Sequence, residues 1–261
     1  MQVPPASSPL QPDPPDFFPM IISERYRYLF IQNEGTGSSS LGEELKNLYG
    51  GREVLWKHAQ LRDFEKVATQ EQREYFVIAG VRNPLDRMVT VYLRMKNESF
   101  RKLENDIRQA QADGAAFKAD NLGRQIEKRR ILQRENLTFA EYFVRFLKGD
   151  EWREHKKLRL EAADYVYRHE HLQEDFADFL GMLGIDRVRP VPNLNPTPEK
   201  DDFLSYYPPE IRRDVIRYTH RSMSALGYAY PGEWVEGSSF IARKRCRLDA
   251  PPRPPLCLHA A

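Results

Sequence analysis

The sequence predicts an α/β fold in which helices flank a central parallel sheet. Two segments support this prediction, because each reads as a buried apolar strand, a tight polar turn and the start of a helix. They are residues 28–41 and residues 75–92. The chain of 261 residues, 41% of them hydrophobic, has the length and composition of one domain with a well-buried core.

The other elements alternate along the chain as such a fold requires. The expected strands are residues 26–32, 54–57, 75–81 and 165–167, and the expected helices cover about residues 39–49, 61–68, 84–95, 138–146, 172–183 and 209–226. Asn83 can cap the third of these helices, and Pro84 suits its first position. Residues 96–136 are charged and helix-prone, which predicts an inserted helical hairpin that faces solvent along most of its length.

Two terminal segments have compositions typical of disordered tails. We expect a Pro-rich tail over residues 1–24, a folded domain over residues 25–240 and a basic, Pro-rich tail over residues 241–261. Cys246 and Cys257 both lie in the last segment, where they suit neither a zinc site nor a disulfide core. The cysteine usage therefore favours a reducing compartment.

Charge and hydropathy exclude several classes of partner. A net charge of +2 is too small to imply a nucleic-acid partner. No run reaches the ~18 apolar residues of a membrane helix, and the N-terminus lacks the charged and apolar regions of a signal peptide. We therefore expect a cytoplasmic protein that binds neither nucleic acid nor membrane. No feature of the sequence indicates an oligomeric state.

The two strand–turn–helix segments share a chemical consequence. A turn at a helix start aims backbone N–H groups at an anion, so two such cradles suggest a ligand with phosphate at two separate places. The first turn differs from the Walker A loop, which needs a lysine just before its Ser or Thr. Phosphate binding by residues 36–39 therefore does not imply ATP hydrolysis, and the missing lysine disfavours a kinase-like nucleotide enzyme.

The same segments resemble the paired motifs of sulfotransferases that use 3′-phosphoadenosine 5′-phosphosulfate (PAPS), particularly the carbohydrate and uronyl-type branch, family 2. The second segment, V-R-N-P-L-D-R-M-V-T-V-Y from Val81, is the more specific of the two. Three later segments are similar to family motifs in the same order, namely residues 167–172, 191–195 and 226–228. The resemblance spans about residues 26–228 and implies a single P-loop-like domain.

This resemblance also implies which residues form the site. The loop for the 5′-phosphosulfate falls on Gly35, Thr36, Gly37, Ser38, Ser39 and Ser40. The 3′-phosphate arginine falls on Arg82 and the accompanying hydroxyl on Thr90. An arginine fork beside a helix start suits a phosphate. The family resemblance implies PAPS as co-substrate and its desulfated form, 3′-phosphoadenosine 5′-phosphate (PAP), as product. It also implies a hydroxyl or amine acceptor and no metal.

One departure from the family pattern bears on activity. Gly35 stands where the family's loop has a lysine, and Glu34 precedes it where proline is usual. Losing one preorganised donor of this kind costs about 3–4 kcal/mol of transition-state stabilisation. Either another cation replaces the lysine, with Lys57 and Lys46 as candidates, or the chain is a non-catalytic relative that binds PAP or PAPS.

Histidines supply the candidate for a catalytic base. Residues 56–64 resemble the segment that carries the catalytic histidine of some uronyl-type sulfotransferases, and this places His58 as the base. A neutral imidazole can take a hydroxyl proton, while a buried or capping histidine is the alternative. His169 and His171 are spaced to share a strand face, but no third ligand is evident, so we interpret them as polar residues at a strand end.

Two further points stay open at the level of sequence. Arg87 fits a surface ion pair or structural role as well as it fits ligand binding. The acceptor is a small molecule or a glycan, and the lack of secretory signals favours a small molecule. Residues 96–136 follow the second motif directly, so we expect them to shape the acceptor pocket.

Overall fold

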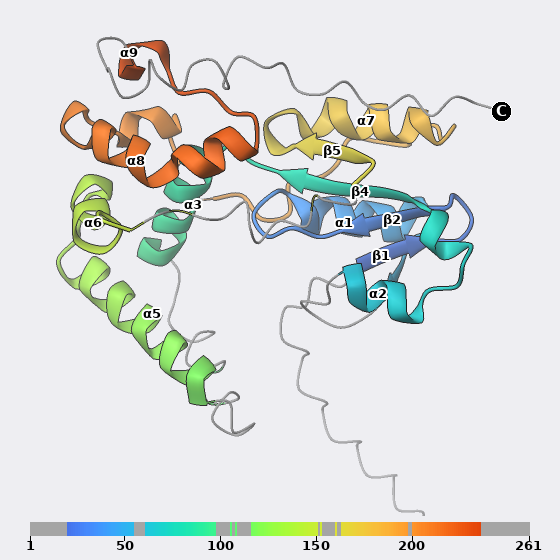
Figure 1. Ribbon diagram of the computed structural model, residues 1–261, viewed down its shortest axis with the longest axis horizontal. Helices are drawn as coiled ribbons and strands as arrows, with labels where there is room; N and C mark the ends of the chain where they lie inside the picture. Colours follow the sequence, from blue (N-terminus) through green and yellow to red (C-terminus); the bar gives the residue numbers. More distant parts are fainter. Residues whose placement is uncertain are drawn as a thin grey trace, which may run out of the picture.

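The computed structural model describes residues 20–54, 61–97, 105, 108, 116–150, 152, 160, 163–197 and 200–235. A five-stranded sheet lies at the centre of this part of the chain. The strands are β1 (Met20–Ser23), β2 (Tyr28–Ile31), β3 (Arg52–Val54), β4 (Phe76–Val81) and β5 (Tyr165–Arg168), in the spatial order β3-β1-β2-β4-β5. Strands β2, β4 and β5 run parallel, whereas β1 is antiparallel to β2 and β3. This sheet confirms the predicted α/β fold (Figure 1).

Strand β1 corrects the predicted N-terminal boundary. Met20–Ser23 were expected within the disordered tail 1–24, yet all four residues are buried in the sheet. A turn that includes Arg27, with a left-handed φ of 54°, connects them to β2. Three apolar residues and a serine are too short a run to be separated by pattern from the Pro-rich residues before them. The extra strand pairs antiparallel with β2 and β3, so the sheet is mixed while β2, β4 and β5 are parallel as expected.

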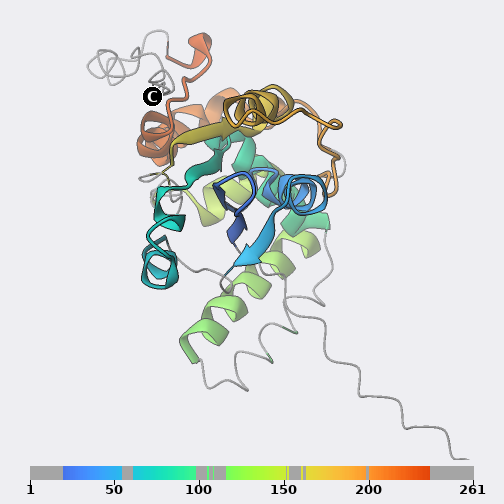
Figure 2. The same cartoon turned by 90° about the vertical axis from the view of Figure 1, so that its right-hand side faces the viewer.

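Helices cover both faces of the sheet and form a second cluster beside it (Figures 1 and 2). The described helices are α1 (Ser38–Leu48), α2 (Leu61–Val67), α3 (Pro84–Asn97), α5 (Ala116–Arg134), α6 (Phe139–Phe146), α7 (Leu172–Met182), α8 (Pro209–Ala225) and α9 (Gly232–Val235), with short 3₁₀ helices η1 (Gln72–Glu74), η3 (His169–His171) and η4 (Phe203–Tyr206). Within these ranges no helix combines the length and apolar character that crossing a membrane requires. The expected strand over residues 54–57 overlaps the described chain only at Val54, the last residue of β3.

Alternating side chains bury the sheet on both faces, as its apolar strands predicted. On one face Phe30, Ile78 and Tyr167 pack with residues of α1 and α7. On the other face Leu29 and Val77 pack with Phe64 of α2. Successive strand residues point to opposite faces, so each apolar strand contributes to both cores.

The second helical cluster lies beyond the carboxyl ends of the parallel strands. In Figure 1 the arrows of β4 and β5 point toward it. Helices α3, α5, α6 and α8 share its core, which includes Leu85, Met88, Leu132, Phe143 and Val215. Tyr207, fully buried beside η4, donates its hydroxyl to the Leu85 carbonyl oxygen at 2.7 Å and so fixes the start of α3.

Helix α5 differs in part from the solvent-facing insert that its charge predicted. Its second half buries Ile126 and Leu132, and the helix contacts α3. The helix projects away from the sheet in both views (Figures 1 and 2). Apart from residues 105 and 108, residues 98–115 lie outside the described chain, so the predicted hairpin stays a prediction.

Gly80 in β4 is a point where packing tolerates no side chain. A Cβ at this position would lie 2.2 Å from Cζ of the fully buried Tyr167 on β5. We expect Gly80→Ala to destabilise the protein by about 1–3 kcal/mol through overpacking. Gly181→Ala is the control, because a Cβ there meets nothing within 4 Å in helix α7. Urea unfolding that gives equal free energies for the two variants would contradict this account.

Candidate anion-binding site

Three strand ends meet at one edge of the sheet. Strands β2, β4 and β5 are parallel and adjacent, so the chain leaves all three at the same edge. The loop 33–37 follows β2, Arg82 follows β4, and η3 follows β5. Ligands of open α/β sheets bind outside this carboxyl edge.

The first loop is held in one conformation by its own hydrogen bonds. Gly35 and Gly37 have φ values of +76° and +79°, a left-handed region that favours glycine. The hydroxyls of Thr36 and Ser38 both donate to the Asn33 carbonyl oxygen, at 2.8 and 2.7 Å. Asn33 in turn donates its Nδ2 to the Gly80 carbonyl oxygen at 3.0 Å, which ties the loop to β4.

Backbone N–H groups at the start of helix α1 are available as donors to an anion. Helix α1 begins at Ser38, and its N-cap is Gly37, which has no side chain to cap the first turn. The first N–H groups of a helix have no intrahelical acceptor. The oxygen of the Ser40 hydroxyl accepts the Leu194 N–H at 3.1 Å, and its O–H can still donate. Of the residues assigned to this loop, 38–40 therefore offer N–H groups at a positive helix end.

Arg82 connects the two motifs. Its Nε donates to Asp86 Oδ2 at 2.7 Å, and its Nη1 donates to the Gly35 carbonyl oxygen at 3.1 Å. Lys200 makes a second ion pair with the buried Asp86 carboxylate. Although burial alone would raise it, these two cations hold the pKa of Asp86 below its usual value. The pKa of Lys200 is below its usual value. Burial and the nearby Arg82 charge lower it by more than the Asp86 carboxylate raises it.

Thr90 presents a buried hydroxyl on the same helix. Asp86 and Thr90 are four residues apart on α3 and therefore share a face. Thr90 is fully buried, and its Oγ1 has no hydrogen-bond partner among the described residues. A buried hydroxyl without a partner costs free energy, so this atom is suited to a polar ligand atom.

Arg87 lies directly against the first loop. A Cβ at Gly35 would come within 2.5 Å of Arg87 Nε and 2.6 Å of its Cζ. The arginine is 7% exposed, and its Nη2 lies 3.3 Å from Glu34 Oε1. The ion pair foreseen for Arg87 therefore exists, but it is at the edge of the loop and on a buried arginine.

The two lysines named as replacements for the loop lysine have different outcomes. Lys46 lies in the last turn of α1, at the far end of the helix from the loop. Its Nζ pairs with Glu43 at 2.7 Å and Glu53 at 2.8 Å, so Lys46 is wrong as a substitute cation. Lys57 and the candidate base His58 lie outside the described residues.

His169 reaches the loop from the end of β5. A Cβ at Gly37 would lie 3.1 Å from its Nδ1, a buried atom with no hydrogen-bond partner among the described residues. Burial, together with the Arg82 charge, lowers the pKa of His169. His171 is exposed, so the expected shared strand face is wrong: β5 ends at Arg168 and both histidines lie in a 3₁₀ helix. No cluster of three or more metal-ligating side chains occurs among the described residues.

The later segments that carry the family resemblance also meet here. Glu170 accepts the Asn83 N–H at 2.6 Å and the Tyr228 hydroxyl at 2.8 Å. The Arg168 guanidinium lies 4.5 Å from the centre of the Tyr228 ring. Glu170 thereby joins the end of β5 to the start of α3 and to the segment after α8.

Sequence reasoning missed Asp86, Lys200 and the position of His169 at the loop. Asp86 has a local signal, because it stands four residues after Arg82. Lys200 has none, since it lies 114 residues from the carboxylate that it pairs with.

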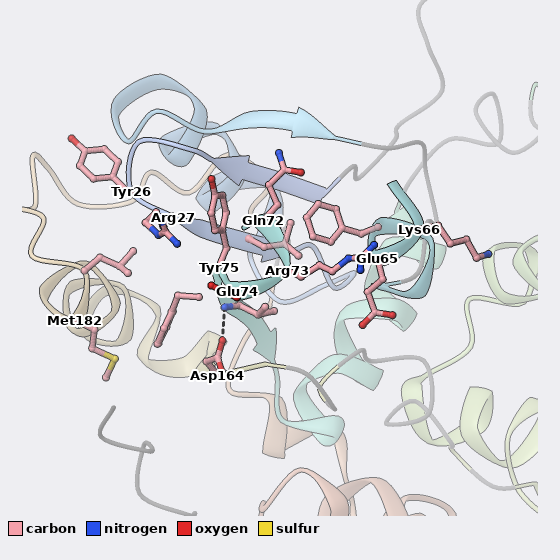
Figure 3. Close-up of a pocket in the computed structure, with 15 residues that line it drawn as sticks. Tyr26, Arg27, Glu65, Lys66, Gln72, Arg73, Glu74, Tyr75, Asp164 and Met182 are labelled. Atoms are coloured by element: carbon pink, nitrogen blue, oxygen red, sulfur yellow. Dashed lines mark hydrogen bonds between the residues drawn. The ribbon is translucent and has the colours of Figure 1, made fainter. Parts of the chain in front are cut away.

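A pocket of about 1010 Å³ opens at the opposite, amino-terminal edge of the parallel strands (Figure 3). Tyr26, Arg27 and Tyr75 line it, together with Asp164, which accepts the Val77 N–H at 2.7 Å. The lining takes Leu29 and residues 75–77 from the strand parts of the two segments but none of residues 35–40, Arg82 or Thr90, and it mixes acidic with basic groups. This pocket is therefore separate from the anion cradle.

The fold and the site define an α/β protein with two candidate anion-binding motifs at one sheet edge. Residues 20–229 match the model of the sulfotransferase family. The match covers most of the chain, which therefore belongs to the sulfotransferase family. Searches of curated proteins and of solved structures returned no match.

The lowered pKa of His169 predicts a pH-dependent stability. An unfolded histidine has a pKa of about 6.5, so below that pH the unfolded state binds the proton more readily than the native state. The stability present above this pH should therefore fall on acidification until the native pKa is passed. Urea unfolding at pH 7.5 and 5 should show a smaller difference for His169→Gln than for the parent. Replacement of the exposed His171 by Gln is the control, and equal pH dependence in all three proteins would contradict the prediction.

Proposed function

We propose that this chain transfers the sulfuryl group of PAPS to a hydroxyl or amine acceptor. The observation that carries the proposal is the meeting of the two motifs, since Arg82 contacts both Asp86 on α3 and the Gly35 carbonyl of the first loop. Two anion-binding features at one edge suit a nucleotide with phosphates at both the 3′ and the 5′ positions. Membership of the sulfotransferase family supports sulfuryl transfer as the reaction.

In this proposal each motif binds one end of the nucleotide. The uncapped N–H groups at the start of α1 hold the 5′-phosphosulfate, and Arg82 holds the 3′-phosphate together with the hydroxyl of Thr90, which has no partner in the described part of the chain. Asp86 orients Arg82, because a carboxylate bound to Nε fixes the direction of the guanidinium. The Arg82 guanidinium would thus already have its binding orientation in the free protein.

His58 acts as the general base in the proposed reaction. The PAPS sulfur receives the attacking acceptor oxygen, and the bond from sulfur to the 5′-phosphate oxygen breaks with its electron pair going to PAP. His58 takes the proton that the acceptor hydroxyl loses. General-base catalysis of this kind raises the rate of a reaction by about 10²–10⁴. The acceptor is a small molecule or a glycan, and residues 96–136 would shape its pocket. The cytoplasmic location expected from the sequence stays a prediction.

The alternative is a relative that binds PAP or PAPS without turnover. Gly35 supports it, because no lysine stands at this position of the loop. An acceptor screen with radiolabelled PAPS, run beside calorimetry with PAP, separates the two functions. Tight PAP binding with no labelled product from any hydroxyl or amine acceptor would favour the non-catalytic alternative.

Nucleotide binding should depend on Arg82. A hydrogen bond to a charged group is worth about 1.5–3 kcal/mol, so Arg82→Ala should weaken PAP at least about tenfold by calorimetry. Thr90→Val should have a smaller effect of the same sign, because one neutral hydrogen bond is lost. The control is Arg73→Ala, at the amino-terminal edge of the sheet. If Arg82→Ala binds PAP as tightly as Arg73→Ala does, the 3′-phosphate site is misplaced.

Turnover should depend on His58. His58→Ala should lower the rate of sulfuryl transfer by roughly two decades or more, while PAP affinity changes little, because the base acts on the acceptor. Transfer by the parent should rise with pH as the imidazole loses its proton. His169→Ala is the informative comparison, since His169 also lies at the edge of the site. Full turnover by His58→Ala with a proven acceptor would remove the base assignment.

A further inference from the structure

The space beside Gly35 already contains a cation. The guanidinium of Arg87 lies so close that a Cβ on Gly35 would overlap its Nε and Cζ, at 2.5 and 2.6 Å. Helix α3 places the arginine there from its first turn, where the Arg87 N–H donates to the Asn83 carbonyl oxygen at 2.9 Å. The position that lost its lysine and the side chain of a second motif therefore form one unit.

The pairing of charges at this edge shows which carboxylate an anion can displace. Asp86 is 6% exposed and bound to both Arg82 and Lys200. Glu170 accepts two hydrogen bonds, from Asn83 and Tyr228. Glu34 differs, because its side chain is 73% exposed and its ion pair with Arg87 spans 3.3 Å. A carboxylate at the surface can turn into water at little cost, whereas a buried arginine needs an anion beside it.

We propose that Arg87 replaces the family's loop lysine as the cation for the 5′-phosphate of the nucleotide, and that Glu34 is its exchangeable counterion in the free protein. The inference deepens the proposed function and rests on it. Glu34 stands in for the phosphate until the nucleotide binds, and it competes with the nucleotide for the same guanidinium. A planar guanidinium can bind two phosphate oxygens at once, which an ammonium group cannot do in the same geometry.

This arrangement determines the effect of restoring the family residue. A lysine at position 35 would need a left-handed backbone, at φ +76°, and its Cβ would displace Arg87. Gly35→Lys should therefore lower the affinity for PAP, not raise it. A gain in PAP affinity or in turnover from Gly35→Lys would contradict the proposal.

Two nucleotides distinguish the phosphate that Arg87 binds. Calorimetry should compare PAP with adenosine 3′-monophosphate, which lacks the 5′-phosphate. Arg87→Met should weaken PAP about tenfold to a hundredfold, the worth of a charge-assisted contact, and should change adenosine 3′-monophosphate by less than about twofold. Arg87→Lys should recover part of the loss. Lys46→Met is the matched control, a cation on α1 that pairs with Glu43 and Glu53.

The exposed partner gives an independent test that does not endanger folding. Glu34→Gln removes a competing charge, so PAP should bind about two- to fivefold more tightly, a change of the size expected for one surface ion pair. Unchanged or weaker PAP binding by Glu34→Gln overturns the counterion role. If Arg87→Met does not fold, the PAP affinity of Glu34→Gln alone decides whether the proposal stands.

The outcomes separate this inference from the proposed function. If the parent protein does not bind PAP, the proposed function fails. If the parent binds PAP and Arg87→Met binds it equally well, only the role of Arg87 fails. Equal weakening of PAP and adenosine 3′-monophosphate by Arg87→Met also overturns that role, since it would indicate a general loss of the site.

Discussion

The buried carboxylate of Asp86 holds the site together. It pairs with Arg82 from the end of β4 and with Lys200 from a distant loop, and the orientation of Arg82 brings that side chain to the Gly35 carbonyl. Both partners of the Arg82–Asp86 pair are almost fully buried, with 8% of each side chain exposed. Removing one partner of such a pair leaves an uncompensated charge in the interior, which typically costs about 3–5 kcal/mol. The geometry of the first loop therefore depends on a contact made by the second motif.

Hydrogen bonds between the first loop and residues of β4 and β5 support this contact. Tyr167 packs over Gly80 and its hydroxyl lies 3.1 Å from Thr36 Oγ1, while Asn33 binds the Gly80 carbonyl oxygen. The loop therefore rests on two strands besides its own. The hydroxyls of Thr36 and Ser38 donate to Asn33, so the donors that remain for an anion are backbone N–H groups, the hydroxyls of Ser39 and Ser40, and arginine side chains. These hydrogen bonds form without a ligand, and preorganisation of this kind reduces the entropy lost when a ligand binds.

Local patterns predicted most of the fold and part of the site. Asn83 accepts the Leu85 N–H at 2.9 Å, and Pro84 begins α3, as their residue types indicated. The helix expected from residue 138 also forms, and Thr138 makes a capping box with Glu141 at the start of α6. Such signals extend over three or four residues, so a sequence pattern contains them in full.

What the sequence pattern could not contain are contacts between distant segments. Lys46 is close to the loop in sequence, but a helix rises about 1.5 Å per residue, so eight residues place it ~12 Å away. Arg87 and Lys200 reach the site through the packing of α3 and of the loop before η4, and neither position follows from a local rule. The sequence shows Glu34 where proline is usual, and only the structure shows that Arg87 pairs with it.

A crystal structure of the protein with PAP tests the central claim most directly. The account predicts one phosphate within about 3 Å of the N–H groups at the start of α1, with Arg87 turned from Glu34 to that phosphate, and the other phosphate on Arg82 and Thr90. PAP bound elsewhere, for example in the pocket at the amino-terminal edge of the sheet, would contradict it.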